Sequence, residues 1–298
     1  MSELKFYIVD VFAETLFSGN QLAVVKNASA LSTDEMQKIA REMNFSETTF
    51  IVSDKKRNGG FDVQIFTPKT ELPFAGHPTL GTAYVIRKAF TNNQAEQINL
   101  NLKVGQIPVT IKYNEKEREI LWMKLKSPNF GDVYGPEEWS EILNLDKTDF
   151  DENFPVHEVS CGVYCFIVPL KTLNAIKKAR VNLDRFYEFI TTTQAKTILV
   201  FTRETLQKKN DLYVRFFGHY LGVPEDPATG SANGCLAAYL VKHEYFGPDA
   251  IDVRVEQGYE LDRPSLLLLK ANKESEEIHV NIGGRVLMVA EGKIYIQD

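Results

Sequence analysis

The chain has 298 residues, a net charge of −6 and 44% hydrophobic residues, which is typical of a globular protein long enough for two cores. The acidic balance argues against a broad phosphate-binding face, so no nucleic acid partner is expected. No apolar stretch approaches the length of a bilayer, the first residues lack a signal peptide's apolar segment, and three cysteines suit a reducing compartment. We therefore expect a cytoplasmic protein without a membrane partner.

The first half of the chain predicts strands around one buried helix. Ser32, followed by Thr-Asp-Glu, indicates a helix start, because a serine caps free N–H groups and acids suit the positive end of a helix. Residues 79–88 are apolar on nearly all sides, which is typical of a helix buried all round. Apolar and β-branched segments predict strands at residues 5–12, 21–25, 49–53 and 60–67.

The second half follows the same plan. Residues 231–243 again read as a helix that is apolar on most faces, and a further helix is expected at 183–191. Residues 126–138 are rich in proline and glycine and predict a linker. Strands are expected at residues 156–170, 198–202, 212–217, 252–257, 265–270, 278–282, 285–290 and 293–296.

Two similar polar loops precede the two apolar helices. Glu71-Leu-Pro-Phe-Ala-Gly-His-Pro-Thr79 aligns with Glu225-Asp-Pro-Ala-Thr-Gly-Ser-Ala-Asn233 at an offset of 154 (230 − 76). Gly76 then falls on Gly230, and His77 on Ser231. Further matches occur in the same order, with offsets that drift from 143 to 158 as loop insertions would produce. The order predicts an internal duplication with an α+β fold, a first lobe over 1–125 and a second over 126–298, the chain's end returning to the first lobe.

The two loops are candidate anion sites. The N-terminus of a helix offers unpaired N–H groups and a partial positive charge, and glycine lets a ligand approach the backbone. Two such ends, at Gly76 and Gly230, would bind a small anionic carboxylate even in an acidic protein. The alternative is that both glycines only shape turns and that Ser231 is a helix cap.

Three ionisable residues are candidates for proton transfer. Glu47 lies in a short polar run beside Phe45 and Phe50, and desolvation there would suit a general acid and base, whereas a solvated loop glutamate is the alternative. His77 is either a proton shuttle or a loop-structuring residue. Asp226 is either a site residue or a cap of the turn that follows it.

The remaining signals are weaker. Cys161 and Cys165 lie in an expected strand, and Cys235 in an apolar helix, so all three favour burial over zinc or redox chemistry. Phosphate-loop, dinucleotide and metal motifs are missing, so we expect no cofactor and no metal.

Four segments resemble the PhzF family, named for an isomerase of phenazine biosynthesis. They are Val9–Phe12 with Phe17–Val24, Asn44–Phe50, Pro73–Gly81 and Asp226–Asn233, and Gly283-Gly-Arg285 adds to them. The resemblance covers essentially the whole chain, in the family's order. It implies the diaminopimelate epimerase-like fold, in which each lobe is a curled mixed sheet around a central helix and the active site lies in the cleft, and it implies a homodimer.

The same resemblance implies roles for individual residues. Glu47 matches the proton-transferring glutamate, and His77, Asp226 and Ser231 match polar residues around the substrate. Gly76 and Gly230 match backbone positions that face the substrate carboxylate, and Asn20 is a further substrate contact. The epimerases proper carry one cysteine on each loop, whereas this chain has Ala75 and Thr229 near those places, which argues against a two-thiol racemase.

Three functions remain open from the sequence. The first is a cofactor-independent isomerase in which Glu47 moves a proton within a small carboxylic acid. The second is a racemase or epimerase that uses Glu47 with Asp226 or His77. The third is a catalytically silent protein that binds a small acid or a protein partner.

Overall fold

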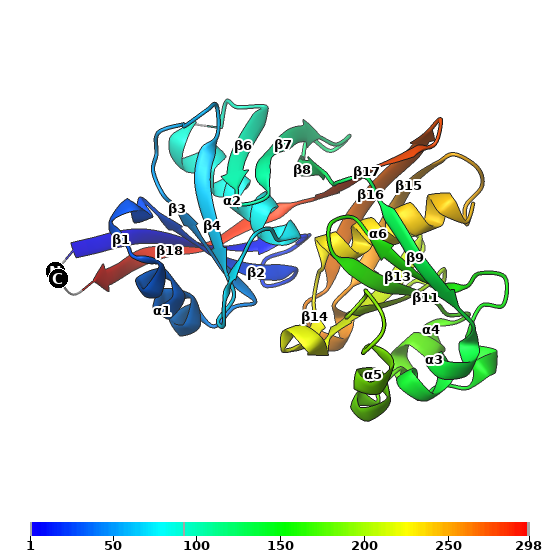
Figure 1. Cartoon of the computed structure of the whole chain (residues 1–298). Coiled ribbons are helices and arrows are strands. Elements are labelled where there is room, and N and C mark those ends of the chain that lie inside the picture. The colour runs from blue at the N-terminus through cyan, green and yellow to red at the C-terminus, as the bar shows by residue number, and fades with distance from the viewer. Residues whose placement is uncertain (1, 92, 297–298) are drawn as a thin grey trace. The chain divides into compact units, whose positions relative to one another are not determined.

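The computed structural model describes residues 2–91 and 93–296, and the chain divides into two compact units. Unit 1 comprises Met1–Lys124 with Gly283–Asp298, and unit 2 comprises Leu125–Ile282. The C-terminal strand β18 (Val286–Ile296) pairs along the length of β1 (Ser2–Val11), the red and blue strands of Figure 1. The end of the chain therefore belongs to unit 1.

Unit 1 is a mixed sheet with α2 (Gly76–Phe90) as its central helix. From β18 and β1 the sheet continues through β2, then in parallel to β3, antiparallel to β4, in parallel to β6, and on through β7 to β8. The strands are β2 (Asn20–Lys26), β3 (Glu47–Ile51), β4 (Phe61–Phe66), β5 (Glu71–Leu72), β6 (Gln97–Leu102), β7 (Gly105–Tyr113) and β8 (Glu119–Lys124).

The central helix α2 packs closely because one of its residues has no side chain. A Cβ atom at Gly81 would lie 2.5 Å from Leu22 Cδ2 and 2.9 Å from Val11 Cγ2, so a larger residue would have to displace these side chains of β1 and β2. Helix α1 (Thr33–Met43) begins with a capping box at Ser32, as predicted, and packs on the other face of the sheet through Met36 and Ile39.

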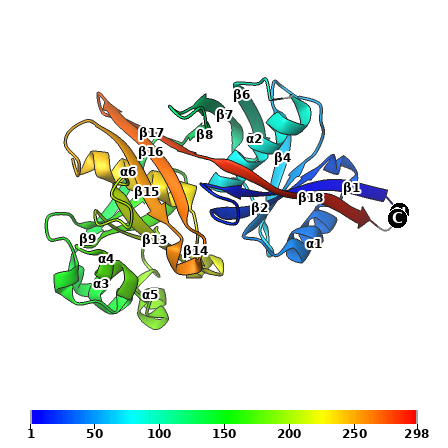
Figure 2. The ribbon, with the colours of Figure 1, turned by 180° about the vertical axis from the view of Figure 1, so that it is seen from behind.

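Unit 2 repeats this arrangement around α6 (Gly230–Lys242), which packs against β10, β11, β12, β15 and β16 (Figures 1 and 2). Its strands are β9 (Asn129–Tyr134), β10 (Val156–Ser160), β11 (Tyr164–Pro169), β12 (Ile198–Thr202), β13 (Leu212–Gly218), β14 (Val223–Asp226), β15 (Ala250–Gln257), β16 (Ser265–Glu274) and β17 (Glu277–Gly284), whose last two residues lie in unit 1. Its remaining helices are α3 (Pro136–Leu143), α4 (Leu173–Lys178) and α5 (Leu183–Phe189).

The pairing pattern confirms the predicted duplication and the α+β fold. In unit 2 the sheet runs from β9 antiparallel to β10 and β11, in parallel to β12, antiparallel to β13, in parallel to β15 and antiparallel to β16. This is the order of parallel and antiparallel steps found from β18 to β7. In both units a short strand, β5 or β14, leads into the central helix.

Two sequence predictions about the second half were wrong. The expected linker at 126–138 contains strand β9, whose partly exposed residues and single glycine hid the apolar pattern of a strand. Helices α3 and α4 were not predicted, because each is under three turns long and buries only a few side chains. Trp139 of α3 is fully buried in a cluster with Phe166 and Phe186.

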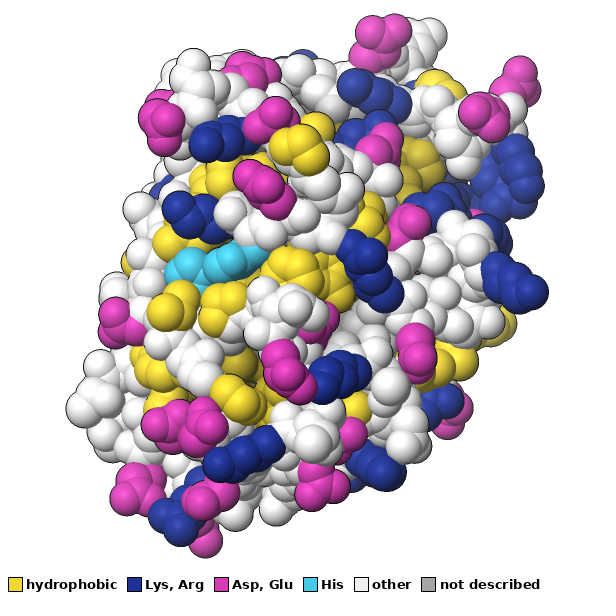
Figure 3. Space-filling model, turned by 90° about the vertical axis from the view of Figure 1, so that its right-hand side faces the viewer, with side chains coloured by type: hydrophobic (Ala, Val, Ile, Leu, Met, Phe, Trp, Pro, Cys, Tyr) yellow, Lys and Arg dark blue, Asp and Glu magenta, His cyan; other side chains and the backbone are white. Residues whose placement is uncertain are grey.

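No helix within residues 2–91 and 93–296 has the length and apolar character to cross a membrane. On the face drawn in Figure 3, acidic and basic side chains alternate, with hydrophobic and histidine side chains between them.

Candidate active site

Three predicted residues of unit 1 lie together, and we name them the Glu47 cluster: Asn20, Glu47 and His77. Asn20 is the first residue of β2, Glu47 is the first residue of β3, and His77 is the second residue of α2. The parallel register of β2 and β3 sets Leu22 opposite Glu47, so the starts of both strands meet at one edge of the sheet. The start of α2 lies at the same edge.

Short polar contacts join the Glu47 cluster. The Nδ2 atom of Asn20 lies 3.3 Å from Nδ1 of His77, and Nε2 of His77 lies 3.3 Å from Oε2 of Glu47. When Asn20 donates to Nδ1, the ring proton sits on Nε2. Nε2 lies close to Oε2 of Glu47, but the two atoms do not form a hydrogen bond. The imidazole can therefore orient the Glu47 carboxylate or donate to a ligand beside it.

Burial keeps the imidazole of His77 neutral. His77 is 5% exposed, and desolvation lowers its pKa from the usual 6.5 to about 3. The contact with Glu47 is therefore one between a neutral ring and a carboxyl group, although a carboxylate at this distance would favour the charged ring. We take burial to dominate, because the ring is almost fully enclosed.

The environment of Glu47 differs from the predicted one in a single respect. Its side chain is 16% exposed and starts a strand, so it is not a solvated loop residue. Phe50, however, does not desolvate it, because alternate strand residues point to opposite faces and Phe50 packs with α1 in a separate cluster. On the Glu47 face the next residue is Thr49, whose Oγ1 lies 2.8 Å from Oγ1 of Thr82 in α2.

A tight loop before β2 positions Asn20. The buried carboxylate of Asp10 accepts a hydrogen bond of 2.8 Å from the backbone N–H of Phe17. Gly19 has φ +71°, and a Cβ atom there would overlap the carbonyl oxygen of Val11. The backbone conformation of this turn therefore requires glycine at position 19. The turn places Asn20 at the start of β2.

In unit 2, Asp226 ends β14 and begins the segment that leads into α6, residues 226–230, which we name the Asp226 loop. Asp226 is 8% exposed, and its Oδ2 accepts a hydrogen bond from the hydroxyl of Thr229. The sequence left open that Asp226 caps the following turn, and this bond shows that it does fix the turn.

Gln257, a residue that the sequence analysis did not identify, forms hydrogen bonds with the Asp226 loop. It is fully buried at the end of β15, and its Nε2 donates to the carbonyl oxygen of Asp226 at 2.8 Å. Its Oε1 accepts from the backbone N–H of Thr229 at 3.2 Å and from Nδ2 of Asn233 at 2.9 Å. The available signal was a polar residue closing an apolar strand directly before Gly258.

Gly258 makes this arrangement sensitive to substitution. It has φ +81°, and a Cβ atom would overlap the carbonyl oxygens of Arg263 and Pro227. We expect Gly258→Ala to lower the free energy of unfolding by about 2–4 kcal/mol, measured by urea denaturation. Gly105, its counterpart in unit 1, has φ +112° and open space, so Gly105→Ala should cost about 1–2 kcal/mol from the backbone alone. Equal losses in the two variants would contradict this account.

The two central helices begin without side-chain caps. Helix α2 starts at Gly76 after Ala75, helix α6 starts at Gly230 after Thr229, and neither first turn contains an acidic residue or a side-chain cap bond. Ser231 is therefore not a helix cap, and it lies half-buried in the first turn of α6. Backbone N–H groups in the first turn of a helix are donors of the kind that bind an anion.

The duplication is not symmetrical in its chemistry. Leu22 aligns with Cys165 at the offset of 143 (165 − 22), and the register that pairs Phe166 with Ile198 sets Cys165 opposite Thr197. Thr197 thus takes the place of Glu47, and Val163 that of Asn20. Cys161, Cys165 and Cys235 are free thiols and buried as predicted, and burial raises the pKa of Cys165. Unit 2 therefore offers no ionisable residue where unit 1 has its carboxylate.

Within the described part of the chain, no three histidine, cysteine, aspartate or glutamate side chains are grouped as metal ligands. The chemistry available at the described clusters is that of a carboxyl group, a neutral imidazole, amides, hydroxyls and backbone N–H groups. Such groups transfer protons and bind carboxylates.

A duplicated α+β fold with a polar loop before each central helix is the architecture that comparison with known proteins can place in a family. The family described as "Phenazine biosynthesis-like protein" matches residues 9–292, so the chain belongs to the PhzF family. It is an isomerase of this family, as its named relatives are.

Individual relatives agree with this assignment. The chain is 32% identical to a trans-2,3-dihydro-3-hydroxyanthranilate isomerase of Pseudomonas fluorescens, over 98% of this chain and 99% of that one. The structure resembles that of a PhzF family phenazine biosynthesis protein from Bacillus anthracis, with a TM-score of 0.91, 28% identity and coverage of 99% and 100%. A hydroxyproline epimerase from Agrobacterium vitis shares the fold at a TM-score of 0.64 and 9% identity, covering 99% of this chain and 93% of its own.

Proposed function

We propose that the chain is a cofactor-independent isomerase that moves a proton within a small carboxylic acid, with Glu47 as the group that carries the proton. The observation that supports this most is the Glu47 cluster itself. It places a largely buried carboxyl group 3.3 Å from a neutral imidazole, and the duplicated unit has Thr197 at the corresponding position. Because unit 2 has no ionisable residue at the position of Glu47, a single carboxyl group suits a reaction in which the proton leaves and returns through the same group.

In the proposed reaction the Glu47 carboxylate takes a proton from a C–H bond next to a conjugated or electron-withdrawing group. The electron pair of that bond enters the conjugated system. The carboxylic acid form of Glu47 then returns the proton to another carbon of the same molecule, where the electron pair forms the new C–H bond. No electron or proton is gained or lost overall, so the reaction consumes no cofactor.

The other predicted residues have supporting roles in this proposal. His77 and Asn20 orient the carboxyl group of Glu47. The backbone N–H groups at Gly76 and Gly230 bind the carboxylate of the substrate and stabilise developing negative charge. Asp226 and Ser231 are assigned hydrogen bonds to the substrate. We also propose that the protein is cytoplasmic and that it forms a homodimer. Sedimentation of the purified protein would test the homodimer.

A substrate test follows from the names of the relatives. Trans-2,3-dihydro-3-hydroxyanthranilate is the first probe, incubated with the enzyme in D₂O and followed by proton NMR. The proposal predicts loss of hydrogen at one carbon and a new C–H or C–D bond at another. Exchange with inversion at a single stereocentre would instead identify an epimerase, and binding without any exchange a catalytically silent protein.

Since selectivity depends on side chains beyond the Glu47 cluster, a panel of small carboxylic acids should accompany this probe. A ligand at 100 times its Kd raises the free energy of unfolding by about 2.7 kcal/mol, which a thermal shift detects. Binders from the panel then enter the same NMR assay. A panel in which no acid binds would contradict the proposal of a small-carboxylate site.

A further inference from the structure

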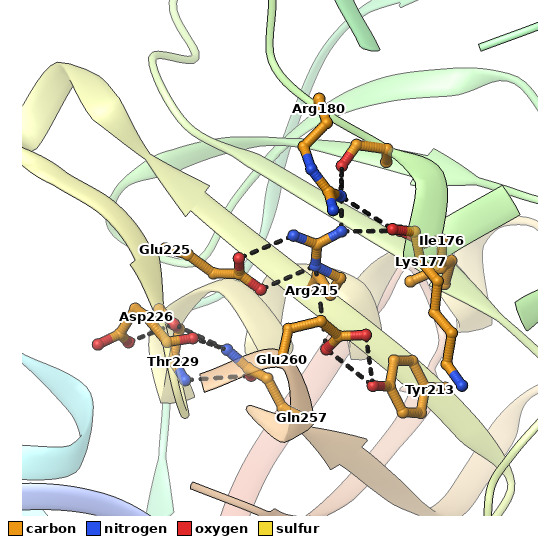
Figure 4. Close-up of polar contacts among 11 residues, drawn as sticks. Ile176, Lys177, Arg180, Tyr213, Arg215, Glu225, Asp226, Thr229, Gln257 and Glu260 are labelled. Carbon is orange, nitrogen blue, oxygen red and sulfur yellow. Dashed lines mark hydrogen bonds and ion pairs between the residues drawn. The ribbon is translucent and has the colours of Figure 1, made fainter. Parts of the chain in front are cut away.

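A buried arginine grips the strand that carries Asp226. Arg215 of β13 is 4% exposed, and its guanidinium holds Glu225 of β14 with two hydrogen bonds, from Nε to Oε1 and from Nη2 to Oε2, each of 2.8 Å. Its Nη1 donates to the carbonyl oxygens of Ile176 at 2.9 Å and Ala179 at 3.1 Å, at the end of α4 (Figure 4).

A second carboxylate completes this group, which we name the Arg215 clamp: Arg215, Glu225, Glu260 and Tyr213. Oε2 of Glu260 lies 3.9 Å from Nε of Arg215, and both oxygens of Glu260 accept from the hydroxyl of Tyr213 at 2.8 Å. Burial opposes the charge of Arg215, but Glu225, Glu260 and Tyr213 together offset it and leave the pKa of the guanidinium above its usual value. The clamp is thus a charged, hydrogen-bonded group in the interior of unit 2.

The clamp and Asp226 lie on opposite faces of β14. Adjacent strand residues point to opposite sides, so Glu225 faces Arg215 while Asp226 faces Thr229. Figure 4 shows the two groups on either side of the strand, with Gln257 next to the Asp226 loop. Glu260 belongs to the turn Tyr259–Leu261, which directly follows Gln257 and Gly258. The clamp therefore reaches the Asp226 loop along two routes, through Glu225 and through Gln257.

A fork of this kind constrains direction as well as distance. Two parallel N–H···O bonds between a guanidinium and a carboxylate fix the plane of both groups, which a lysine cannot do. Within a low-dielectric interior, neither partner can be removed without leaving a buried charge. Nothing in the reaction as derived above uses Arg215, Glu225 or Glu260, although all three are largely buried close to Asp226.

We propose that Arg215 is a positioning residue, which sets the place of Asp226 by gripping Glu225 from the opposite face of β14. The part of this inference that concerns catalysis rests on the proposed function, whereas the grip on the loop does not. A residue that merely stabilised the fold would weaken unit 2 as a whole. A positioning residue loosens the Asp226 loop first.

Backbone hydrogen–deuterium exchange of the full chain, read by mass spectrometry, tests the grip without any substrate. Arg215→Lys keeps the charge but loses the fork, and Glu225→Gln keeps the shape but loses the charge. For both we expect exchange over residues 223–233 to accelerate about tenfold or more, while β15 and β16 change by less than about twofold. Arg57→Met is the matched control, because Arg57 makes the same fork to Asp62 at 2.7 and 3.0 Å on the exposed surface of unit 1.

The catalytic part is tested with a confirmed substrate. Arg215→Lys should lower kcat by about 10–100-fold with KM little changed, as loss of an orienting partner does elsewhere, and Arg57→Met should leave both unchanged. Unchanged exchange at 223–233, or acceleration spread evenly over unit 2, would overturn the inference. Faster loop exchange with normal kcat would overturn the role in catalysis. If no acid is turned over by the wild type, the proposed function fails. The exchange experiment alone then decides whether Arg215 restrains the Asp226 loop.

Discussion

Glu47→Gln should lower kcat on a confirmed substrate by about 10³-fold to 10⁴-fold or more. General acid and base groups contribute about 10²–10⁴-fold, and a residue that both removes and returns the proton belongs at the top of that range. Glutamine keeps the size of the side chain and its contact with His77, but it cannot take a proton. KM and the melting temperature should stay close to those of the wild type.

The control for this variant is Glu119→Gln. Glu119 is also largely buried in unit 1, with a side chain 22% exposed and paired with Arg87 at 2.9 Å, but it lies outside the Glu47 cluster. Glu119→Gln should cost stability and leave kcat near the wild-type value. His77→Ala and Ser231→Ala should lower kcat less than Glu47→Gln, because each removes a supporting hydrogen bond. If Glu47→Gln works within about tenfold of wild type, Asp226 or His77 becomes the candidate base.

Acid should destabilise the protein through His77. Its pKa is about 3 in the folded chain and 6.5 when exposed, so below pH 6.5 the unfolded chain binds a proton that the folded chain does not. Stability from this residue is complete above pH 6.5 and is lost as the pH falls toward 3. At about 1.4 kcal/mol per pH unit, the loss reaches about 2 kcal/mol by pH 5 and on the order of 5 kcal/mol by pH 3.

Urea unfolding of wild type and His77→Gln between pH 7.5 and 4.5 measures this contribution. His243 acts in the same direction, because burial lowers its pKa to about 4, so only the difference between the two proteins reports on His77. The variant should be less stable near pH 7.5 and should lose less stability on acidification. Parallel curves for the two proteins would show that the imidazole of His77 titrates normally and is not buried as described.

Much of the fold could be predicted from the sequence, because the duplication repeats patterns that are local. The central helices around Gly76 and Gly230 are apolar on nearly every side, and their polar loops are contiguous in the chain. The contact of Glu47 with His77 could not be predicted from local sequence patterns, because it depends on the register of β2 with β3 and on the close packing at Gly81. The fork between Arg215 and Glu225 depends in the same way on the pairing of β13 with β14.

The role of Gln257 could not be predicted from the sequence either. Its side-chain amide forms hydrogen bonds that hold the Asp226 loop in place, yet in the sequence it is one polar residue after an apolar strand. The prediction that Phe50 desolvates Glu47 was wrong, because the two residues point to opposite faces of β3. Sequence patterns therefore indicated which residue types matter, whereas the faces and partners of those residues came from strand alternation and register.

The most direct test of Glu47 as proton carrier is exchange at the substrate carbon itself. A confirmed substrate is held in D₂O with an excess of wild type, Glu47→Gln or Glu119→Gln, and the loss of its acidic C–H signal is followed by NMR. This reports cleavage of the C–H bond separately from product release. The account predicts rapid loss with wild type and Glu119→Gln, and no loss above the enzyme-free rate with Glu47→Gln even when the substrate is bound. Loss of the C–H signal at the wild-type rate with Glu47→Gln would contradict it.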